Sequence, residues 1–112
     1  MSIRVLLVDD HPVVRHGLRR MLEQEEDIKV VGEAVSGEEA LAQIESISPS
    51  IILMDIKMPG MGGIEAIHQI KERYPEINII VLTLYGDQYL AQAIESGATG
   101  YLVKDIGGED LI

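Results

Sequence analysis

The sequence contains no cysteine and no apolar run near the roughly 20 residues that a membrane-spanning helix requires. Without cysteine, neither disulfide bonds nor a thiolate site can carry structure or chemistry. Residues 1–4 lead directly into an apolar strand pattern and lack the basic start and apolar core of a signal peptide. We therefore expect a cytoplasmic protein that makes no contact with a membrane.

Basic residues are also scarce, because 9 lysines and arginines stand against 19 acidic residues and give a net charge of −10. Such an acidic surface repels phosphate backbones and argues against direct binding of nucleic acid. It favours instead a cation or a basic partner surface. The chain has 112 residues, 46% of them hydrophobic and 25% charged, which predicts one globular domain.

Five short apolar segments recur along the chain and predict β-strands. The first, residues 3–8, is rich in β-branched residues and almost continuously apolar, which is typical of a strand buried on both faces. The other four predicted strands cover residues 28–35, 51–54, 77–82 and 100–103.

Amphipathic segments with start and stop signals lie between these strands and predict helices. Pro12 suits the first turn of a helix, and Ser36 begins a capping box. Pro75 ends a third helix, and Asp87 can cap a fourth. A last helix begins near Gly108. The apolar stripes of the first four are Val14, Leu18, Met21 and Leu22; Ala40, Leu41, Ile44 and Ile47; Ile64, Ile67, Ile70 and Tyr74; and Leu90, Ala93 and Ile94.

This alternation predicts the α/β class, in which crossover helices cover both faces of a parallel sheet. We predict a doubly wound, flavodoxin-like sheet of five strands in the order 2-1-3-4-5. The last helix is cut off at Ile112. We therefore expect residues 1–112 to be a C-terminally truncated domain with apolar surface exposed beside the first helix.

Polar residues follow the predicted strands at the edge where doubly wound sheets bind ligands. Asp9 and Asp10 follow the first strand, Asp55 the third, Thr83 the fourth and Lys104 the fifth. Three carboxylates at close quarters repel one another and need compensation. Lys104 supplies one positive charge, and a divalent cation would supply the rest. Because the candidate ligands are hard oxygens, we predict Mg²⁺.

This set of groups predicts phosphoryl-transfer chemistry. A carboxylate beside Mg²⁺ and a lysine can attack a phosphoryl group and form an acyl phosphate. The cation and Lys104 would stabilise the phosphoryl oxygens, and the hydroxyl of Thr83 could donate to one of them.

Four strings carry a resemblance to a known family: VDDHP at 8–12, LMDIKMPGM at 53–61, VLT at 81–83 and GYLVKD at 100–105. In this order and spacing, the chain resembles over its whole length the receiver domains of two-component response regulators. The first and last strings are most similar to the NarL/LuxR-type subfamily.

The resemblance implies a role for each matching position. Asp55 corresponds to the phosphoacceptor, and Lys104 to the lysine that binds the phosphoryl group. Asp9 and Asp10 correspond to the acidic Mg²⁺ site, to which Asp55 and the main-chain carbonyl of Lys57 also contribute.

Two further positions correspond to a conformational switch. Thr83 corresponds to the hydroxyl that moves toward the phosphoryl group, and Tyr101 to the aromatic residue that turns inward with it. Tyr101 also fits a half-buried strand aromatic without that role. The chain departs from the family pattern at Asp105, where many receivers have proline, and at Gly62, where Asp or Asn is usual.

The resemblance also implies partners. A sensor histidine kinase would donate the phosphoryl group, and phosphorylation would favour a homodimer. Members of the subfamily usually bind DNA through a C-terminal helix-turn-helix domain, and these 112 residues contain none. The chain would catalyse only its own phosphorylation and dephosphorylation and would not be an enzyme acting on a separate substrate.

Three other functions fit parts of the pattern. A phosphohydrolase with an aspartate nucleophile typically has a second acid two residues later, where this chain has Lys57. A flavin-binding module would need a phosphate-binding loop after the first strand, where Asp9 and Asp10 repel phosphate. A receiver that works without phosphorylation would not need the complete set of pocket groups. The histidines, His11, His16 and His68, form no metal set and are expected at the surface, with His11 near the site.

Overall fold

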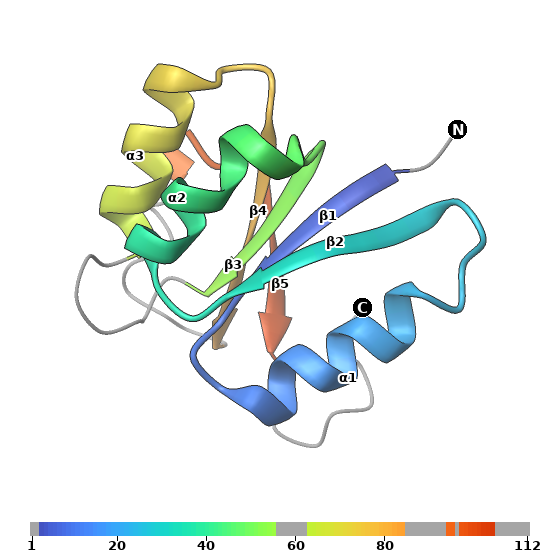
Figure 1. Cartoon of the computed structure of the whole chain (residues 1–112). Coiled ribbons are helices and arrows are strands. Elements are labelled where there is room, and N and C mark those ends of the chain that lie inside the picture. The colour runs from blue at the N-terminus through green and yellow to red at the C-terminus, as the bar shows by residue number, and fades with distance from the viewer. Residues whose placement is uncertain (1–2, 56–62, 85–93, 96, 105–112) are drawn as a thin grey trace.

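The computed structural model describes residues 3–55, 63–84, 94–95 and 97–104, with only the backbone of residues 63, 83–84 and 101–104. Five parallel strands form one sheet in the order β2-β1-β3-β4-β5, which confirms the predicted order (Figure 1). They are β1 (Ile3–Val8), β2 (Ile28–Ala34), β3 (Ile51–Asp55), β4 (Asn78–Leu84) and β5 (Gly100–Lys104).

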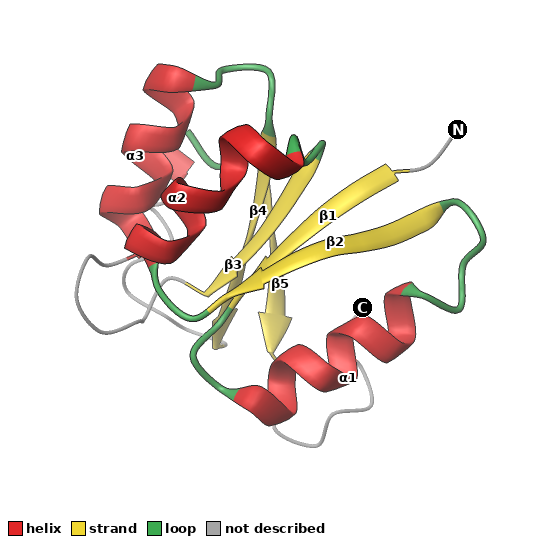
Figure 2. Cartoon of the chain, viewed as in Figure 1, coloured by secondary structure: helices red, strands yellow, loops and turns green. Residues whose placement is uncertain are grey.

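Within the described part of the chain, three helices pack on the two faces of this sheet. They are α1 (Pro12–Leu22), α2 (Gly37–Ile47) and α3 (Gly63–Arg73). Helices α2 and α3 lie together on one face and α1 lies on the other, as a doubly wound topology requires (Figure 2). No helix within the described ranges is long and apolar enough to cross a membrane.

The predicted start signals of α1 and α2 are confirmed. Pro12 occupies the first turn of α1. Backbone N–H groups of the first turn have no partner within the helix, so the missing N–H of proline costs no helical hydrogen bond there. The side chain of Ser36 accepts a hydrogen bond of 3.2 Å from the backbone N–H of Glu39. The fourth helix, which Asp87 was expected to cap, and the last one fall largely or wholly outside the described residues.

Strand β1 runs through the centre of the sheet, and its residues Val5 to Val8 are buried. Alternate side chains of β1 enter two separate apolar clusters. Leu6 and Val8 pack with α2 and α3 in the larger cluster, and Val5 and Leu7 pack with Leu18 of α1 in the smaller one. The near-continuous apolar sequence is therefore explained by burial on both faces.

Three candidate residues lie inside strand ends, whereas the sequence placed them in the loops that follow. Asp55 is the last residue of β3, Thr83 lies within β4, and Lys104 ends β5. The backbone pairing continues that far, because Asp55 is in register with Leu82 and Lys104 with Leu84. The strands thus hold the backbone of these residues more firmly than loops would.

Candidate functional site

The register of the central strands brings two acidic residues together. Val8 at the end of β1 is in register with Met54 of the neighbouring parallel strand β3. The next residues along the two strands are Asp9 and Asp55, so both lie at the carboxyl edge of the sheet. This edge, where the chain winds in opposite directions from β1 and β3, is the usual ligand site of such a fold.

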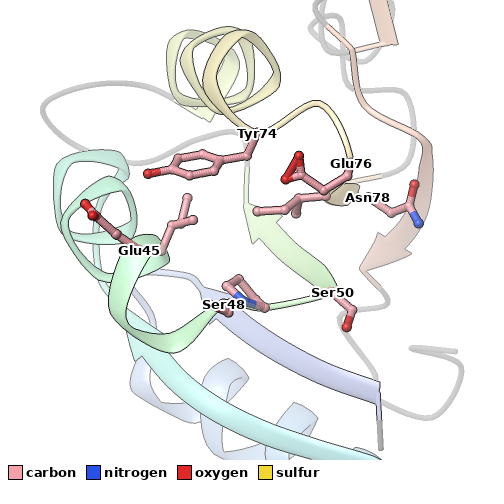
Figure 3. A pocket seen from close by; sticks show the side chains of 9 residues that line it. Glu45, Ser48, Ser50, Tyr74, Glu76 and Asn78 are labelled. Carbon is pink, nitrogen blue, oxygen red and sulfur yellow. The ribbon is translucent and has the colours of Figure 1, made fainter.

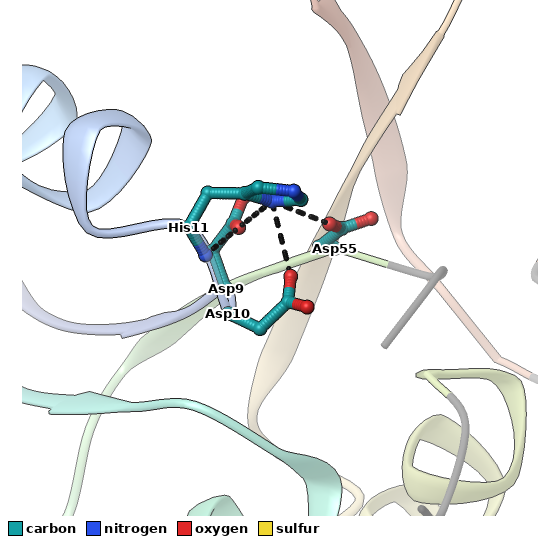
Figure 4. Close-up of side chains that lie close together, drawn as sticks. All are labelled: Asp9, Asp10, His11 and Asp55. Atoms are coloured by element: carbon teal, nitrogen blue, oxygen red, sulfur yellow. Dashed lines mark hydrogen bonds and ion pairs between the residues drawn. The ribbon is translucent and has the colours of Figure 1, made fainter. Parts of the chain in front are cut away.

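His11 connects the carboxylates of this edge (Figure 4). Its Nδ1 atom lies 2.9 Å from Oδ1 of Asp9, 3.0 Å from Oδ1 of Asp10 and 3.9 Å from Oδ2 of Asp55. One ligand atom from each of the four residues lies within 4.8 Å of the others. We call this group the acidic cluster.

The sequence predicts His11 only near the site and at the surface. Its side chain is indeed 61% exposed, but Nδ1 points into the cluster. An ionised carboxylate only accepts hydrogen bonds, so this contact with Oδ1 of Asp9 suits the tautomer of His11 that carries a hydrogen on Nδ1. The position of His11, directly after two aspartates at a strand end, predicts a ring near the cluster but does not determine this contact.

Burial makes the negative charges of the acidic cluster unfavourable. The side chains of Asp9 and Asp55 are only 1% and 6% exposed, and that of Asp10 is 29% exposed. Oδ1 of Asp10 is buried and accepts no hydrogen bond from the described residues, although Nδ1 of His11 approaches it. Buried carboxylate oxygens repel one another unless positive charge lies between them.

The donor set fits a hard divalent cation. Three carboxylates converge from two neighbouring strands, and Asp10 offers an oxygen that the described residues leave without a hydrogen bond. Mg²⁺ prefers carboxylate oxygens and keeps several of its waters, so it needs only a few protein ligands. The acidic cluster could therefore hold Mg²⁺.

Helix α1 and strand β2 hold the backbone of Asp9. The backbone N–H of Asp9 donates to the carbonyl of Ala34 at 3.0 Å, and its own carbonyl accepts a 2.6 Å hydrogen bond from Nη1 of Arg15. Nε of Arg15 donates to Glu33 at 3.0 Å, and Nη1 of Arg19 donates to the other oxygen of Glu33 at 2.6 Å. The predictions from the sequence do not include this group. Two features of the sequence indicate it: Arg15 and Arg19 are four residues apart, and Glu33 is an acidic residue in an apolar strand.

The charges of this group alter two pKa values. Burial raises the pKa of Glu33, but hydrogen bonds from Arg19 and Arg15 outweigh burial, and the net pKa is lowered. The hydrogen bond to Glu33 raises the pKa of Arg19 against the opposing effect of burial. Glu33 is therefore stabilised in its ionised form.

The other predicted site residues are located only by the backbone or not at all. Asp55 is in register with Leu82, so Thr83 lies one residue further along the neighbouring strand β4. Lys104 ends β5, the next strand. The fold thus brings the backbone of all three to one edge. The side chains of Thr83, Tyr101 and Lys104, and the whole of Lys57, lie outside what the structure describes.

A separate pocket of about 500 Å³ opens at the opposite edge of the sheet (Figure 3). It lies beside the start of β3 and β4, between the ends of α2 and α3, and the ring of Tyr74 forms part of its wall. Its charged lining residues are Glu45 and Glu76. The pocket contains no member of the acidic cluster, so the chemistry that the cluster supports takes place elsewhere.

Comparisons with known proteins show the family to which the sequence and fold are similar. Residues 5–112 match the family described as the response regulator receiver domain. The transcriptional regulatory protein YhcZ of Bacillus subtilis is 46% identical over 111 residues, which cover 98% of this chain and 52% of YhcZ. The chain therefore spans about half the length of the curated relatives that it matches.

Two solved structures share the fold. A two-component response regulator of the LuxR family from Aurantimonas is 38% identical with a TM-score of 0.88, covering 99% of this chain and 80% of that one. The isolated REC domain of RcsB from Salmonella enterica, solved with the phosphomimetic BeF₃⁻, is 31% identical with a TM-score of 0.87, covering 99% and 83%.

Proposed function

The chain belongs to the response regulator receiver family, and on that premise we propose that it is a phosphorylation switch in which Asp55 accepts the phosphoryl group. It is a receiver domain of a two-component response regulator. The observation that carries the proposal is the convergence of Asp9, Asp10 and Asp55 within one cluster of ligand atoms.

Asp55 has the position that a nucleophile needs. It ends β3 at the carboxyl edge of the sheet, and one of its carboxylate oxygens lies within 4.8 Å of ligand atoms of Asp9 and Asp10 (Figure 4). A carboxylate oxygen of Asp55 attacks the phosphorus atom of a phosphorylated histidine. The new P–O bond forms as the P–N bond breaks, and the histidine leaves with the bonding electron pair and takes up a proton.

The residues proposed to hold Mg²⁺ are Asp9, Asp10 and Asp55, together with the main-chain carbonyl of Lys57. When bound, the cation neutralises negative charge on the phosphoryl oxygens and on the carboxylates. Asp9 is nearly inaccessible, and hydrogen bonds hold both its backbone N–H and its carbonyl, so its carboxylate is positioned before a cation arrives.

Lys104, Thr83 and Tyr101 complete the proposed switch. The ammonium group of Lys104 would pair with a phosphoryl oxygen, and the hydroxyl of Thr83 would donate to another. The register of β4 with β5 supports these roles, because it carries the backbone of both residues toward the edge where Asp55 lies. Tyr101 would turn inward as Thr83 moves, which changes the surface beside β4 and β5.

We further propose the partners that such a switch requires. A sensor histidine kinase donates the phosphoryl group, and the chain acts on no separate substrate. In the full-length protein, the phosphorylated receiver forms a homodimer and controls a C-terminal helix-turn-helix domain that binds DNA. The name of YhcZ, a transcriptional regulatory protein about twice as long as this chain, supports this role. The cytoplasmic location expected from the sequence stays a prediction.

Intact mass spectrometry after incubation with acetyl phosphate tests the phosphorylation itself. With Mg²⁺ the wild-type chain should gain one phosphoryl group, and without Mg²⁺ it should gain none. The Asp55→Asn variant is the matched control, because it keeps the size of the side chain and removes the nucleophile. Equal labelling of wild type and Asp55→Asn would contradict the proposed role of Asp55.

A further inference from the structure

The peptide that joins Asp9 to Asp10 is held by a helix that lies outside the acidic cluster. The carbonyl oxygen of this peptide is the group that accepts the 2.6 Å hydrogen bond from Nη1 of Arg15. Because a peptide is planar, the direction of its carbonyl also fixes the direction of the following N–H and the start of the next residue. Arg15 therefore fixes the backbone from which the carboxylate of Asp10 extends.

Arg15 is itself held in one orientation. Its side chain is 14% exposed, and Nε donates to Glu33 at 3.0 Å. Glu33 is held in turn by Arg19, and its main-chain carbonyl accepts a 2.9 Å hydrogen bond from Nε2 of Gln43. A planar guanidinium with two fixed acceptors loses most of its rotational freedom, so it can act as a rigid support.

A bulge in β2 turns Glu33 toward α1. The register of β1 with β2 shifts by one residue, which leaves Val31 without a counterpart on β1. Before the bulge Val30 packs in the cluster on the α1 side, and after it Ala34 packs in the cluster on the α2 and α3 side. Regular alternation from Val30 would have placed Ala34 on the α1 side and Glu33 on the other. Bulges often redirect side chains in this way beside active sites.

We propose that Arg15 is a positioning residue for the cation site, and that Glu33 holds it in place and cancels its charge. This inference rests on the proposed function, because it requires that Mg²⁺ binds at Asp9 and Asp10. The ion pair with Glu33 matters for the site. Without it, the guanidinium of Arg15 would position the ligands of Mg²⁺ and at the same time repel the cation.

Positioning and simple electrostatics predict opposite effects of removing Arg15. Loss of a positive charge near the cluster should by itself tighten Mg²⁺ binding. Loss of the support for the Asp9–Asp10 peptide should weaken Mg²⁺ binding. The sign of the change in Mg²⁺ affinity therefore shows whether the loss of charge or the loss of support for the peptide is the larger effect.

The test compares Arg15→Met with Arg19→Met. Each variant removes one guanidinium and one ion pair to Glu33, but only Arg15→Met removes the hydrogen bond to the carbonyl of Asp9. Calorimetric titration with MgCl₂ gives the dissociation constant of each, and urea unfolding without metal gives the stability. We expect the constant of Arg15→Met to rise roughly tenfold, as for other residues that support metal ligands. That of Arg19→Met should change much less, because Glu33 keeps its hydrogen bond with Arg15.

A second variant protects the test against misfolding. Arg15→Lys keeps the charge, but a single ammonium group lacks the planar fork that reaches Asp9 and Glu33 together. We expect its Mg²⁺ affinity to lie between those of the wild type and Arg15→Met. Equal affinities in the wild type and both Arg15 variants, with stability alone reduced, would overturn this inference and leave the proposed function intact. A wild-type chain that binds no Mg²⁺ would contradict both.

Discussion

Asp9 and Asp55 occupy equivalent positions at the carboxyl ends of two adjacent parallel strands, one residue beyond the registered pair Val8 and Met54. Both are almost fully buried, although neither belongs to the apolar core. A fold that places two buried carboxylates side by side, with Asp10 beside them, gives up stability unless a cation or a hydrogen-bond donor lies between them.

Removing the charge of Asp10 should stabilise the metal-free protein. Its carboxylate lies in the acidic cluster, and its Oδ1 accepts no hydrogen bond from the described residues. We expect Asp10→Asn to raise the free energy of unfolding without metal by about 1 kcal/mol, because one repulsive charge is lost. The same variant should lose most of the stabilisation that Mg²⁺ gives the wild type. Urea unfolding with and without MgCl₂ measures both effects, and an Asp10→Asn protein less stable than wild type in both conditions would contradict this account.

The ion pairs of Glu33 should contribute stability that acid removes. The pKa of Glu33 is lowered in the folded state, so the folded protein favours the ionised form. This contribution is present above the ordinary glutamate pKa of 4.5 and is lost as the pH falls through the lower folded value. We expect Glu33→Gln to reduce the free energy of unfolding by about 1 kcal/mol at neutral pH, and the difference to shrink below pH 4.5. A difference that stays constant across that range would show that the charge of Glu33 is irrelevant.

Gly97 should not tolerate a side chain. Its φ angle of +122° is rare for other residues, and a Cβ atom there would lie 2.7 Å from Cγ of Lys71. We expect Gly97→Ala to destabilise the fold by about 1–3 kcal/mol. Gly17→Ala is the matched control, because a Cβ at this position in α1 meets no atom within 4 Å and alanine favours helix. The control should melt at an equal or higher temperature, and a similar loss in both variants would refute the argument from backbone conformation.

The cap of α2 should contribute measurably to stability. Ser36 accepts the hydrogen bond from the N–H of Glu39, whereas Ser46 lies within the helix and only donates to the carbonyl of Gln43. We expect Ser36→Ala to cost about 1 kcal/mol. Ser46→Ala should change stability little, because alanine is the better helix former. Chemical denaturation of the two variants side by side makes this comparison, which fails if Ser46→Ala is the more damaging.

The strand order and the convergence of Asp9, Asp10 and Asp55 could be predicted because they depend on topology. Buried parallel strands have a near-continuous apolar sequence, and the carboxyl ends of adjacent strands meet at one edge. The structure confirms both. The roles of Thr83 and Lys104 stay predictions, because only their backbone is described.

Two features of the site depend on details that topology does not determine. The ring of His11 enters the acidic cluster through a choice of side-chain rotamer, which spacing along the chain does not specify. Glu33 faces α1 because of the bulge at Val31, and the predicted strand over residues 28–35 contained no signal for a shift in register. Since a shift of one residue exchanges the two faces of a strand, the group formed by Arg15, Arg19 and Glu33 was missed.

Locating the phosphorylated residue tests the central claim most directly. After incubation with acetyl phosphate and Mg²⁺, treatment with sodium borohydride reduces an aspartyl phosphate to homoserine, and peptide mass spectrometry identifies its position. We predict homoserine at position 55, dependent on Mg²⁺ and absent from the Asp55→Asn variant. Homoserine at position 9 or 10, or a folded protein that forms none at position 55, would contradict the assignment of Asp55 as the phosphoacceptor.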